Sequence, residues 1–220
     1  MVGKAKSNAW KGSNMFLRYE SFREYIRFYP VNTVVLALLA AAHAGFALYA
    51  WMTGTPAWAL KQEYGGFLLV READIIPEYW RYITSVFLHA DFGHLLFNAF
   101  AIFVFAPPLE RALGSFRYAA LFLFSGIMGN IFTNFYAGPV ASVGASGAVY
   151  GVFGAYVFYM LFRRGALDFA SKRTLQTMLI VGVLYSIAIP QINYFAHLGG
   201  FVGGLVMNAL YTWVLHGRTR

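Results

Sequence analysis

The sequence contains no cysteine and few charged residues. Among its 220 residues there is no Cys, and Asp, Glu, Lys and Arg together make up 12%. The absence of Cys excludes disulfide bonds and thiolate metal sites. Soluble domains contain about 25% charged residues, so this composition does not fit a soluble domain. Hydrophobic residues instead account for 59% of the chain.

The hydrophobic residues gather in long runs. Runs of roughly 20 apolar residues match the ~30 Å hydrocarbon core that a helix must cross. The sequence therefore predicts an all-α, polytopic membrane protein with a bundle of six transmembrane helices. We expect Pro107 and Pro108 to end the second helix, and the fifth helix is the least apolar. The predicted spans are residues 31–52, 83–107, 116–135, 146–162, 175–188 and 192–215.

These spans divide the chain into three parts. Residues 1–30 form a basic cytoplasmic or interfacial segment, residues 31–215 form the six-helix core, and residues 216–220 form a cytoplasmic tail. The loop between the first two spans is rich in aromatic residues, so we expect it to lie at the membrane interface with a short amphipathic helix. Residues 16–29 are expected to lie on the cytoplasmic surface.

The basic residues are divided unevenly between the two sides of the membrane. Of the 17 Lys and Arg residues, all except Lys61, Arg71 and Arg81 fall on the side that holds both termini. Basic residues favour the cytoplasmic side, so both termini are predicted to be cytoplasmic. The net charge of +8 then reflects membrane orientation, and we expect no nucleic-acid partner.

Two polar residues stand out because they lie inside apolar spans. Ser146 begins the fourth span and His197 lies about one turn into the sixth. Polar groups at membrane depth are costly and usually functional. A Ser hydroxyl needs a base to become a nucleophile, and His is the usual base because its pKa lies near neutrality. Small residues beside the pair would let the two helices approach closely. They are Gly144, Gly147, Gly200 and Gly204.

Further polar residues could assist this pair. Tyr150 lies four residues after Ser146, on the same helical face, where its ring could hold the His197 imidazole. No Asp or Glu lies in the last three spans, so a Ser-His dyad is expected rather than a triad. His94 and Asn98 share a face of the second span and could donate to an oxyanion. Ordinary helix packing and interhelical hydrogen bonding are the structural alternatives for these residues.

The motifs together resemble those of a known family. Trp80-Arg81, the series His89, His94 and Asn98, the segment from Gly144 to Tyr150, and the segment from Ala196 to Gly204 resemble the rhomboid intramembrane serine proteases. The resemblance implies a six-helix core with Ser146 as nucleophile and His197 as base. It also implies that His94 and Asn98 assist the oxyanion. We expect neither a cofactor nor a metal.

The same resemblance suggests how substrate is handled. It implies that Trp80 and Arg81 belong to a membrane-embedded first loop, and that the fifth span and residues 189–193 act as gate and cap. The expected substrates are single-pass or polytopic membrane proteins, cut in or near their transmembrane segments. The expected location is a prokaryotic cell membrane, with the active site open to the non-cytoplasmic side.

Three other functions could use some of these residues. A transporter would bind solute through intramembrane polar groups, but these spans contain almost no charge. A zinc enzyme could use His89, His94 and His197, although the H-E-x-x-H pattern is absent. A catalytically inactive rhomboid-like protein would bind membrane proteins without cutting them.

Overall fold

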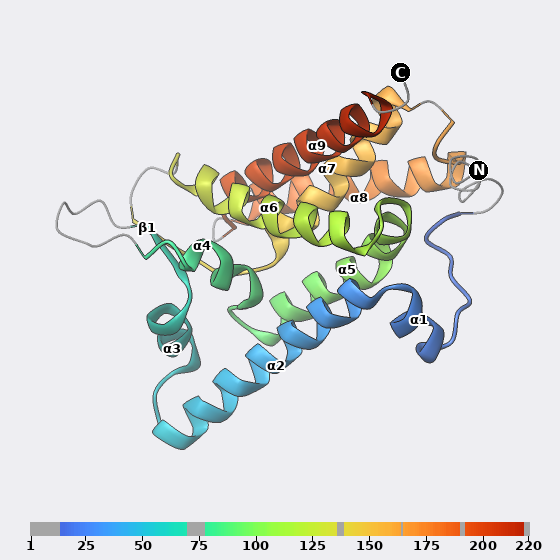
Figure 1. Ribbon diagram of the computed structural model, residues 1–220. Coiled ribbons are helices and arrows are strands. Elements are labelled where there is room, and N and C mark those ends of the chain that lie inside the picture. The colour runs from blue at the N-terminus through green and yellow to red at the C-terminus, as the bar shows by residue number, and fades with distance from the viewer. Residues whose placement is uncertain (1–13, 70–77, 136–138, 164, 190–191, 218–220) are drawn as a thin grey trace.

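The computed structural model describes residues 14–69, 78–135, 139–163, 165–189 and 192–217. This part of the chain is mainly helical (Figure 1). The helices are α1 (Phe22–Phe28), α2 (Pro30–Thr53), α3 (Ala57–Tyr64), α4 (Arg81–Thr84), the 3-10 helix η1 (Ser85–Phe87), α5 (Phe92–Leu113), α6 (Ser115–Thr133), α7 (Ser146–Phe162), α8 (Phe169–Ala188) and α9 (Tyr194–Gly217).

Long apolar helices dominate the architecture. Among the described residues, α2, α5 and α6 are long and apolar enough to cross a membrane, and α7 is a shorter apolar helix. The helices α8 and α9 contain 20 and 24 residues. Large apolar side chains such as Phe97 and Trp213 are exposed on the outside of the molecule, which suits contact with lipid rather than water. The chain is thus built as a polytopic helical membrane protein, and the count of six spans stays a prediction.

Four of the predicted spans match helices closely. The helices α2, α6, α7 and α9 begin and end within two residues of the predicted limits. The predicted fifth span begins too late, because α8 already starts at Phe169. There the side chain of Asp168 caps the helix by accepting the backbone N–H of Ser171 at 2.9 Å. The short helix α3 occupies the loop in which a short helix was expected.

The second predicted span is wrong at its start. Residues 83–87 belong to α4 and η1, and the long helix α5 begins only at Phe92. The cause is Asp91, whose side chain accepts the backbone N–H of His94 at 2.9 Å and so caps a new helix.

The second predicted span is also wrong at its end, because α5 continues through Pro107 and Pro108. A proline has no N–H to donate to the carbonyl four residues earlier, so Pro107 leaves the Phe103 carbonyl without its helical donor. The Arg18 guanidinium donates to that carbonyl at 2.6 Å. A side chain from another segment thus satisfies the acceptor that this proline frees.

A buried carboxylate joins the starts and ends of three helices. Glu110 near the end of α5 accepts the backbone N–H groups of Val31 and Asn32, both at 3.0 Å. It also accepts from the Asn32 amide at 2.7 Å and the Ser115 hydroxyl at 2.8 Å. Tyr118 on α6 donates to the Asn32 side-chain oxygen at 2.8 Å. The free N–H groups at the start of α2 therefore find a negatively charged partner.

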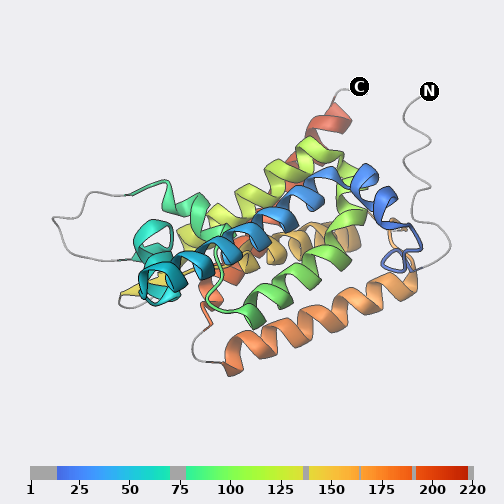
Figure 2. The ribbon, with the colours of Figure 1, turned by 90° about the horizontal axis from the view of Figure 1, so that it is seen from below.

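The segment before α1 packs against the bundle, and its expected place on the cytoplasmic surface stays a prediction. Phe16 is only 9% exposed, and its ring packs edge-on against Phe105 and Tyr156. The backbone N–H of Met15 donates to the Ser171 hydroxyl at the start of α8 at 2.9 Å. This segment therefore closes one end of the bundle (Figure 2). Phe16 is therefore a core residue, whereas Tyr19 in the same segment is exposed.

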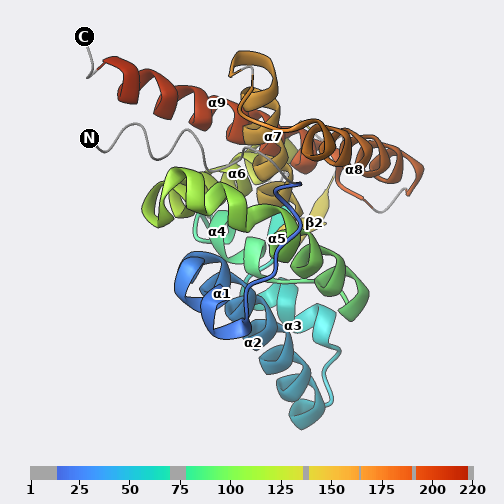
Figure 3. The ribbon, with the colours of Figure 1, turned by 90° about the vertical axis from the view of Figure 1, so that its right-hand side faces the viewer.

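Helix α7 lies at the centre of the bundle, with α6 and α9 packed against it (Figure 3). Glycines allow these helices to touch through their backbones. A Cβ placed on Gly204 would lie 1.8 Å from the Gly151 carbonyl oxygen, and one placed on Gly200 would lie 1.9 Å from that of Gly147. Only a residue without a side chain fits such an approach. The expected close contact between α7 and α9 is confirmed.

Helix α8 lies at the edge of the bundle (Figures 2 and 3). Its buried residues are Ser171, Leu175 and Ser186. In its second half, large apolar side chains such as Val183 and Ile187 are exposed. The helix thus makes few buried contacts beyond its first turns, and Ser186 provides one of them.

Candidate active site

The loop before α7 is held by hydrogen bonds from a distant part of the chain. The backbone N–H of Gly144 donates to the Ser85 carbonyl at 2.9 Å. The backbone N–H of Ala145 donates to His89 Nε2 at 3.5 Å, and the His89 ring is only 1% exposed. Asn130 on α6 donates to the Ser85 hydroxyl at 2.9 Å. These contacts fix the backbone that leads into Ser146.

A small sheet supports the same loop. Strand β1 (Phe67–Leu69) pairs with β2 (Val140–Ser142) in antiparallel register, with Phe67 opposite Ser142. The strands were not predicted, because three residues are too few to produce a clear period-2 pattern. They form through pairing between segments that are far apart in sequence.

Ser146 is the first residue of α7, so it lies where backbone N–H groups have no helical partner. Gly144, two residues earlier, has a φ of +138°, which favours glycine. A Cβ at Gly144 would lie 2.9 Å from His94 Nε2 and 3.8 Å from Ser146 Oγ. The His94 ring and the Ser146 hydroxyl therefore approach the same point beside Gly144. This brings together a hydroxyl, an imidazole and a positively polarised helix end.

His94 and Asn98 lie in the first two turns of α5, on one face as predicted. The Asn98 amide donates to the His94 carbonyl at 2.9 Å and is buried. In the described structure this amide is thus engaged within its own helix. The His94 ring packs edge-on against His89, with ring centroids 5.0 Å apart. His94 therefore lies beside Ser146, and Asn98 lies one turn behind it.

The rings of Tyr150 and His197 stack. Their centroids are 4.2 Å apart and their planes differ by 11°. His197 Nδ1 lies 2.7 Å from the hydroxyl of Ser186 on α8, and the Tyr150 hydroxyl lies 3.0 Å from the same oxygen. The ring of His197 is thus fixed on one face by Tyr150 and at Nδ1 by Ser186.

The nucleophile and base candidates lie on helices that touch. A Cβ on Gly147 would lie 3.4 Å from the Ala196 carbonyl oxygen, so the chain neighbours of Ser146 and His197 are in contact. Within the described residues no hydrogen bond joins Ser146 to His197 themselves. Catalytic hydrogen bonds are often long before substrate binds, so a missing hydrogen bond is compatible with the pair.

The Trp80-Arg81 motif lies outside this cluster. Arg81 donates to the carbonyls of Glu63 and Gly66 at 2.8 and 2.9 Å, and forms an ion pair with Glu78. Its guanidinium also covers the Trp80 ring, 4.5 Å from the ring centroid. These contacts tie α3 to α4. They place the motif in the framework of the first loop.

A buried lysine braces the turn before α5. Lys61 is 3% exposed, and its ammonium donates to the carbonyls of His89 at 2.7 Å and Ala90 at 3.2 Å. Burial lowers the pKa of this ammonium, and the nearby Asp91 carboxylate opposes that shift. Lys61 thus helps to hold the turn that presents His94.

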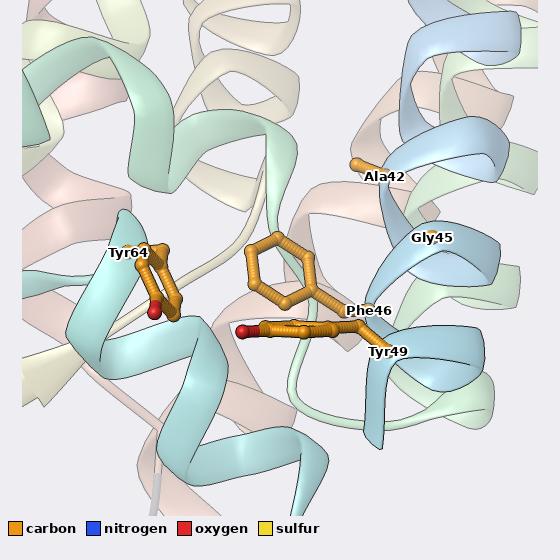
Figure 4. A pocket seen from close by; sticks show the side chains of 5 residues that line it. All are labelled: Ala42, Gly45, Phe46, Tyr49 and Tyr64. Carbon is orange, nitrogen blue, oxygen red and sulfur yellow. The ribbon is translucent and has the colours of Figure 1, made fainter. Parts of the chain in front are cut away.

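Two further features bear on ligand binding, namely the histidines and an apolar groove. Among the described residues, no group of three or more His, Asp or Glu side chains could hold a metal ion. An apolar groove lies between α2 and α3 (Figure 4). Its lining residues are Ala42, Gly45, Phe46, Tyr49 and Tyr64. The groove contains none of the candidate catalytic side chains.

Comparison with known proteins decides the family. Residues 77–214, which are more than half of the chain, match the Rhomboid domain. The chain belongs to the rhomboid family. It is 40% identical over 203 residues to the "Putative rhomboid protease YdcA" of Bacillus subtilis (strain 168), covering 89% of this chain and 96% of the relative.

Two other relatives match more than half of this chain. The rhomboid protease GluP of Bacillus subtilis is 33% identical over 127 residues, covering 58% of this chain and 25% of GluP. The RHOMBOID-like protein 7 of Arabidopsis thaliana is 33% identical over 132 residues, covering 60% of this chain and 42% of the relative. Rhomboid membership and the apolar helices identify an integral membrane protein, and these names support a protease at the level of the family.

Sequence reasoning missed one residue at this site. Ser186 was not selected, although it is a polar residue in an apolar span, which is the usual signal for an intramembrane functional group. His89 was considered only as a motif residue and a zinc ligand, yet it bonds the backbone just before Ser146. Its burial in a polar turn could not be read from the sequence.

Proposed function

We propose that this protein is an intramembrane serine endopeptidase that uses Ser146 and His197 as a dyad. The observation that carries the proposal is the fixed imidazole of His197, stacked on Tyr150 at 4.2 Å and bonded through Nδ1. A base held in this way leaves Nε2 as its reactive nitrogen. The contact between the segments around Gly147 and Ala196 supports the pairing of this nitrogen with the Ser146 hydroxyl.

The proposed reaction has two stages. His197 Nε2 takes the proton of Ser146 as the hydroxyl oxygen attacks a peptide carbonyl, and a tetrahedral oxyanion forms. The imidazolium then gives its proton to the leaving amine, and an acyl-enzyme remains. Water, deprotonated by the same imidazole, releases the carboxyl product and restores the Ser146 hydroxyl.

The oxyanion would be stabilised by groups near the start of α7. The backbone N–H of Ser146 and the positive end of the α7 dipole favour negative charge there. The His94 ring next to Gly144 could donate to the same oxygen. Asn98 would have to turn from the His94 carbonyl to take part. Removal of one such donor typically costs about 10²–10³ in kcat.

The proposed substrates are membrane proteins, single-pass or polytopic, cut in or near transmembrane segments. The site is lined by glycine-rich backbone, so small residues are expected at the cleaved position. The proposed topology has six spans with both termini cytoplasmic, and residues 1–30, 31–215 and 216–220 as segment, core and tail. The active site then opens to the non-cytoplasmic side of a prokaryotic membrane.

The test compares Ser146→Ala and His197→Ala with the unmodified protein in liposomes. Cleavage of a single-pass model substrate should fall to background in both variants, and a fluorophosphonate probe should label only proteins that keep Ser146. A matched control is Ser125→Ala, because the Ser125 hydroxyl on α6 is buried and has no hydrogen-bond partner among the residues that the structure describes. This control should keep both cleavage and labelling.

Two outcomes would overturn the proposal. Cleavage that persists in purified Ser146→Ala would exclude this serine as the nucleophile. A properly folded protein that neither cleaves a panel of transmembrane substrates nor reacts with the probe would instead be a binding member of the family.

A further inference from the structure

The hydroxyl of Ser186 has three polar neighbours but only one hydrogen to donate. It lies 2.7 Å from the Gly182 carbonyl oxygen, 2.7 Å from His197 Nδ1 and 3.0 Å from the Tyr150 hydroxyl. A carbonyl can only accept a hydrogen bond. The contact with Gly182 therefore requires the hydrogen of Ser186.

This assignment decides the roles of the other two groups. Once Ser186 donates to Gly182, its oxygen can only accept from His197 and Tyr150. The Tyr150 hydroxyl must then donate, and His197 Nδ1 must carry the hydrogen. One arrangement of hydrogens thus satisfies all three contacts. In the neutral imidazole it leaves His197 Nε2 unprotonated, which is the state that a general base needs.

From these contacts we infer that Ser186 is a positioning residue that sets the tautomer of His197. The inference rests on the proposed function, in which His197 is the base. Ser186 occupies the place that a carboxylate takes in a triad, at the nitrogen away from the nucleophile. Its oxygen continues to accept from Nδ1 when the imidazole becomes positively charged, so the contact strengthens as the proton is taken.

The surroundings of Ser186 separate this role from ordinary packing. Ser186 is 6% exposed, whereas Val183 and Ile187 on the same half of α8 are 46% and 72% exposed. A helix that turns most of its apolar side chains outward therefore buries a hydroxyl at this point. Gly182 supports the arrangement, because a Cβ there would lie 2.7 Å from the Tyr150 hydroxyl.

The position of Ser186 also joins α8 to the chemistry. The start of α8 is held by the hydrogen bond between the Met15 N–H and the Ser171 hydroxyl. Near the other end, Ser186 contacts the proposed base directly. The correct tautomer of His197 is thus present only when this end of α8 is packed against α7 and α9.

The test uses Ser186→Ala, Ser186→Thr and, as a control, Thr177→Ala, which removes an exposed hydroxyl from the same helix. Nitrogen NMR of protein labelled with ¹⁵N-histidine reports the tautomer in detergent without any substrate, and His197→Ala assigns the signal. The unmodified protein, Ser186→Thr and Thr177→Ala should show His197 protonated at Nδ1. Ser186→Ala should show a mixture of tautomers.

Kinetics provide the second readout. We expect kcat of Ser186→Ala to fall about 10–100-fold, the usual effect of losing a hydrogen bond to a charged group, with KM little changed. Ser186→Thr should restore most of kcat. An unchanged tautomer and kcat in Ser186→Ala would overturn the inference, and so would an equal loss in the Thr variant.

The two proposals can fail separately. If Ser146→Ala still cleaves substrate, the proposed dyad fails. If Ser146→Ala is inactive but Ser186→Ala matches the unmodified protein in both readouts, only the role of Ser186 is lost.

Discussion

At the scale of single residues, the candidate site depends on Gly144 as well as on the groups that are proposed to react. Its φ of +138° favours glycine, and its missing side chain leaves room for the His94 ring. The hydrogen bond from its N–H to the Ser85 carbonyl holds it in place. Backbone conformation and free space at this one residue therefore set the distance between His94 and Ser146.

Gly144→Ala tests this requirement. The added methyl would lie 2.7 Å from His94 Cε1, so the ring must move and the loop before Ser146 must shift with it. We expect fluorophosphonate labelling of Ser146 to slow at least about tenfold, which corresponds to ~1.4 kcal/mol of activation free energy. The measurement is the initial labelling rate in detergent.

Gly165→Ala is the matched control. Gly165 also has a positive φ, +86°, but a Cβ there meets no atom within 4 Å. Backbone strain should lower the melting temperature of both variants. Equal labelling rates for the two variants would show that Gly144 serves only the backbone.

At the scale of elements, the contact between α7 and α9 brings the two catalytic candidates together. Membrane helices associate through close packing of small residues, because lipid supplies no hydrophobic driving force between them. Gly151 and Gly204 provide that packing one turn or more below the candidate site, where their backbones touch. The position of His197 relative to Ser146 is therefore set by glycines that do not react.

Gly204→Ala should separate these helices. Its Cβ would lie 1.8 Å from the Gly151 carbonyl oxygen, and overpacking of this kind costs about 1–3 kcal/mol. We expect a lower melting temperature in detergent and a lower kcat. The control is Gly45→Ala on α2, where a Cβ meets nothing within 4 Å and helix propensity improves. Equal melting temperatures for the two variants would contradict the packing argument.

At the scale of the whole molecule, the bundle has two ends, at which helices begin or end (Figure 1). The short helix α3, the strands and the start of α7 lie at one end. The starts of α2 and α8 lie at the other, where the Met15 N–H and Glu110 hold them. The bias of the basic residues then predicts which end faces the cytoplasm.

Single cysteines can test this orientation, because the chain contains none of its own. We compare Glu63→Cys on α3 with Arg173→Cys near the start of α8, both of which are exposed positions. A maleimide that cannot cross membranes should label Glu63→Cys in intact cells. It should label Arg173→Cys only after the membrane is opened. The reverse pattern would exclude the proposed topology.

The parts of the fold that follow from local signals were predicted well. Apolar runs gave α2, α6 and α7 nearly to the residue, because hydrocarbon thickness fixes the length of a span. The second span failed, since Asp91 caps a new helix and the carbonyl freed by Pro107 is satisfied by Arg18. Such effects involve partners whose positions cannot be read from hydropathy.

The candidate site divides in the same way. Ser146, His197, Tyr150 and His94 could be selected from residue type and spacing, because polar groups in apolar helices are rare. Ser186 could not be assigned, since its role depends on which face of α8 packs inward. The assignment of Asn98 to the oxyanion stays a prediction, and in the described structure its amide donates to the His94 carbonyl.

The sequence alone determined that this chain is a helical membrane protein and which residues could carry the chemistry. Composition and apolar run length are sufficient for the first, because the bilayer acts on every span in the same way. Tertiary structure decided how the imidazole of His197 is held and where the segment around Phe16 packs. Those outcomes depend on contacts between distant helices, which arise only once glycine-lined backbones come together.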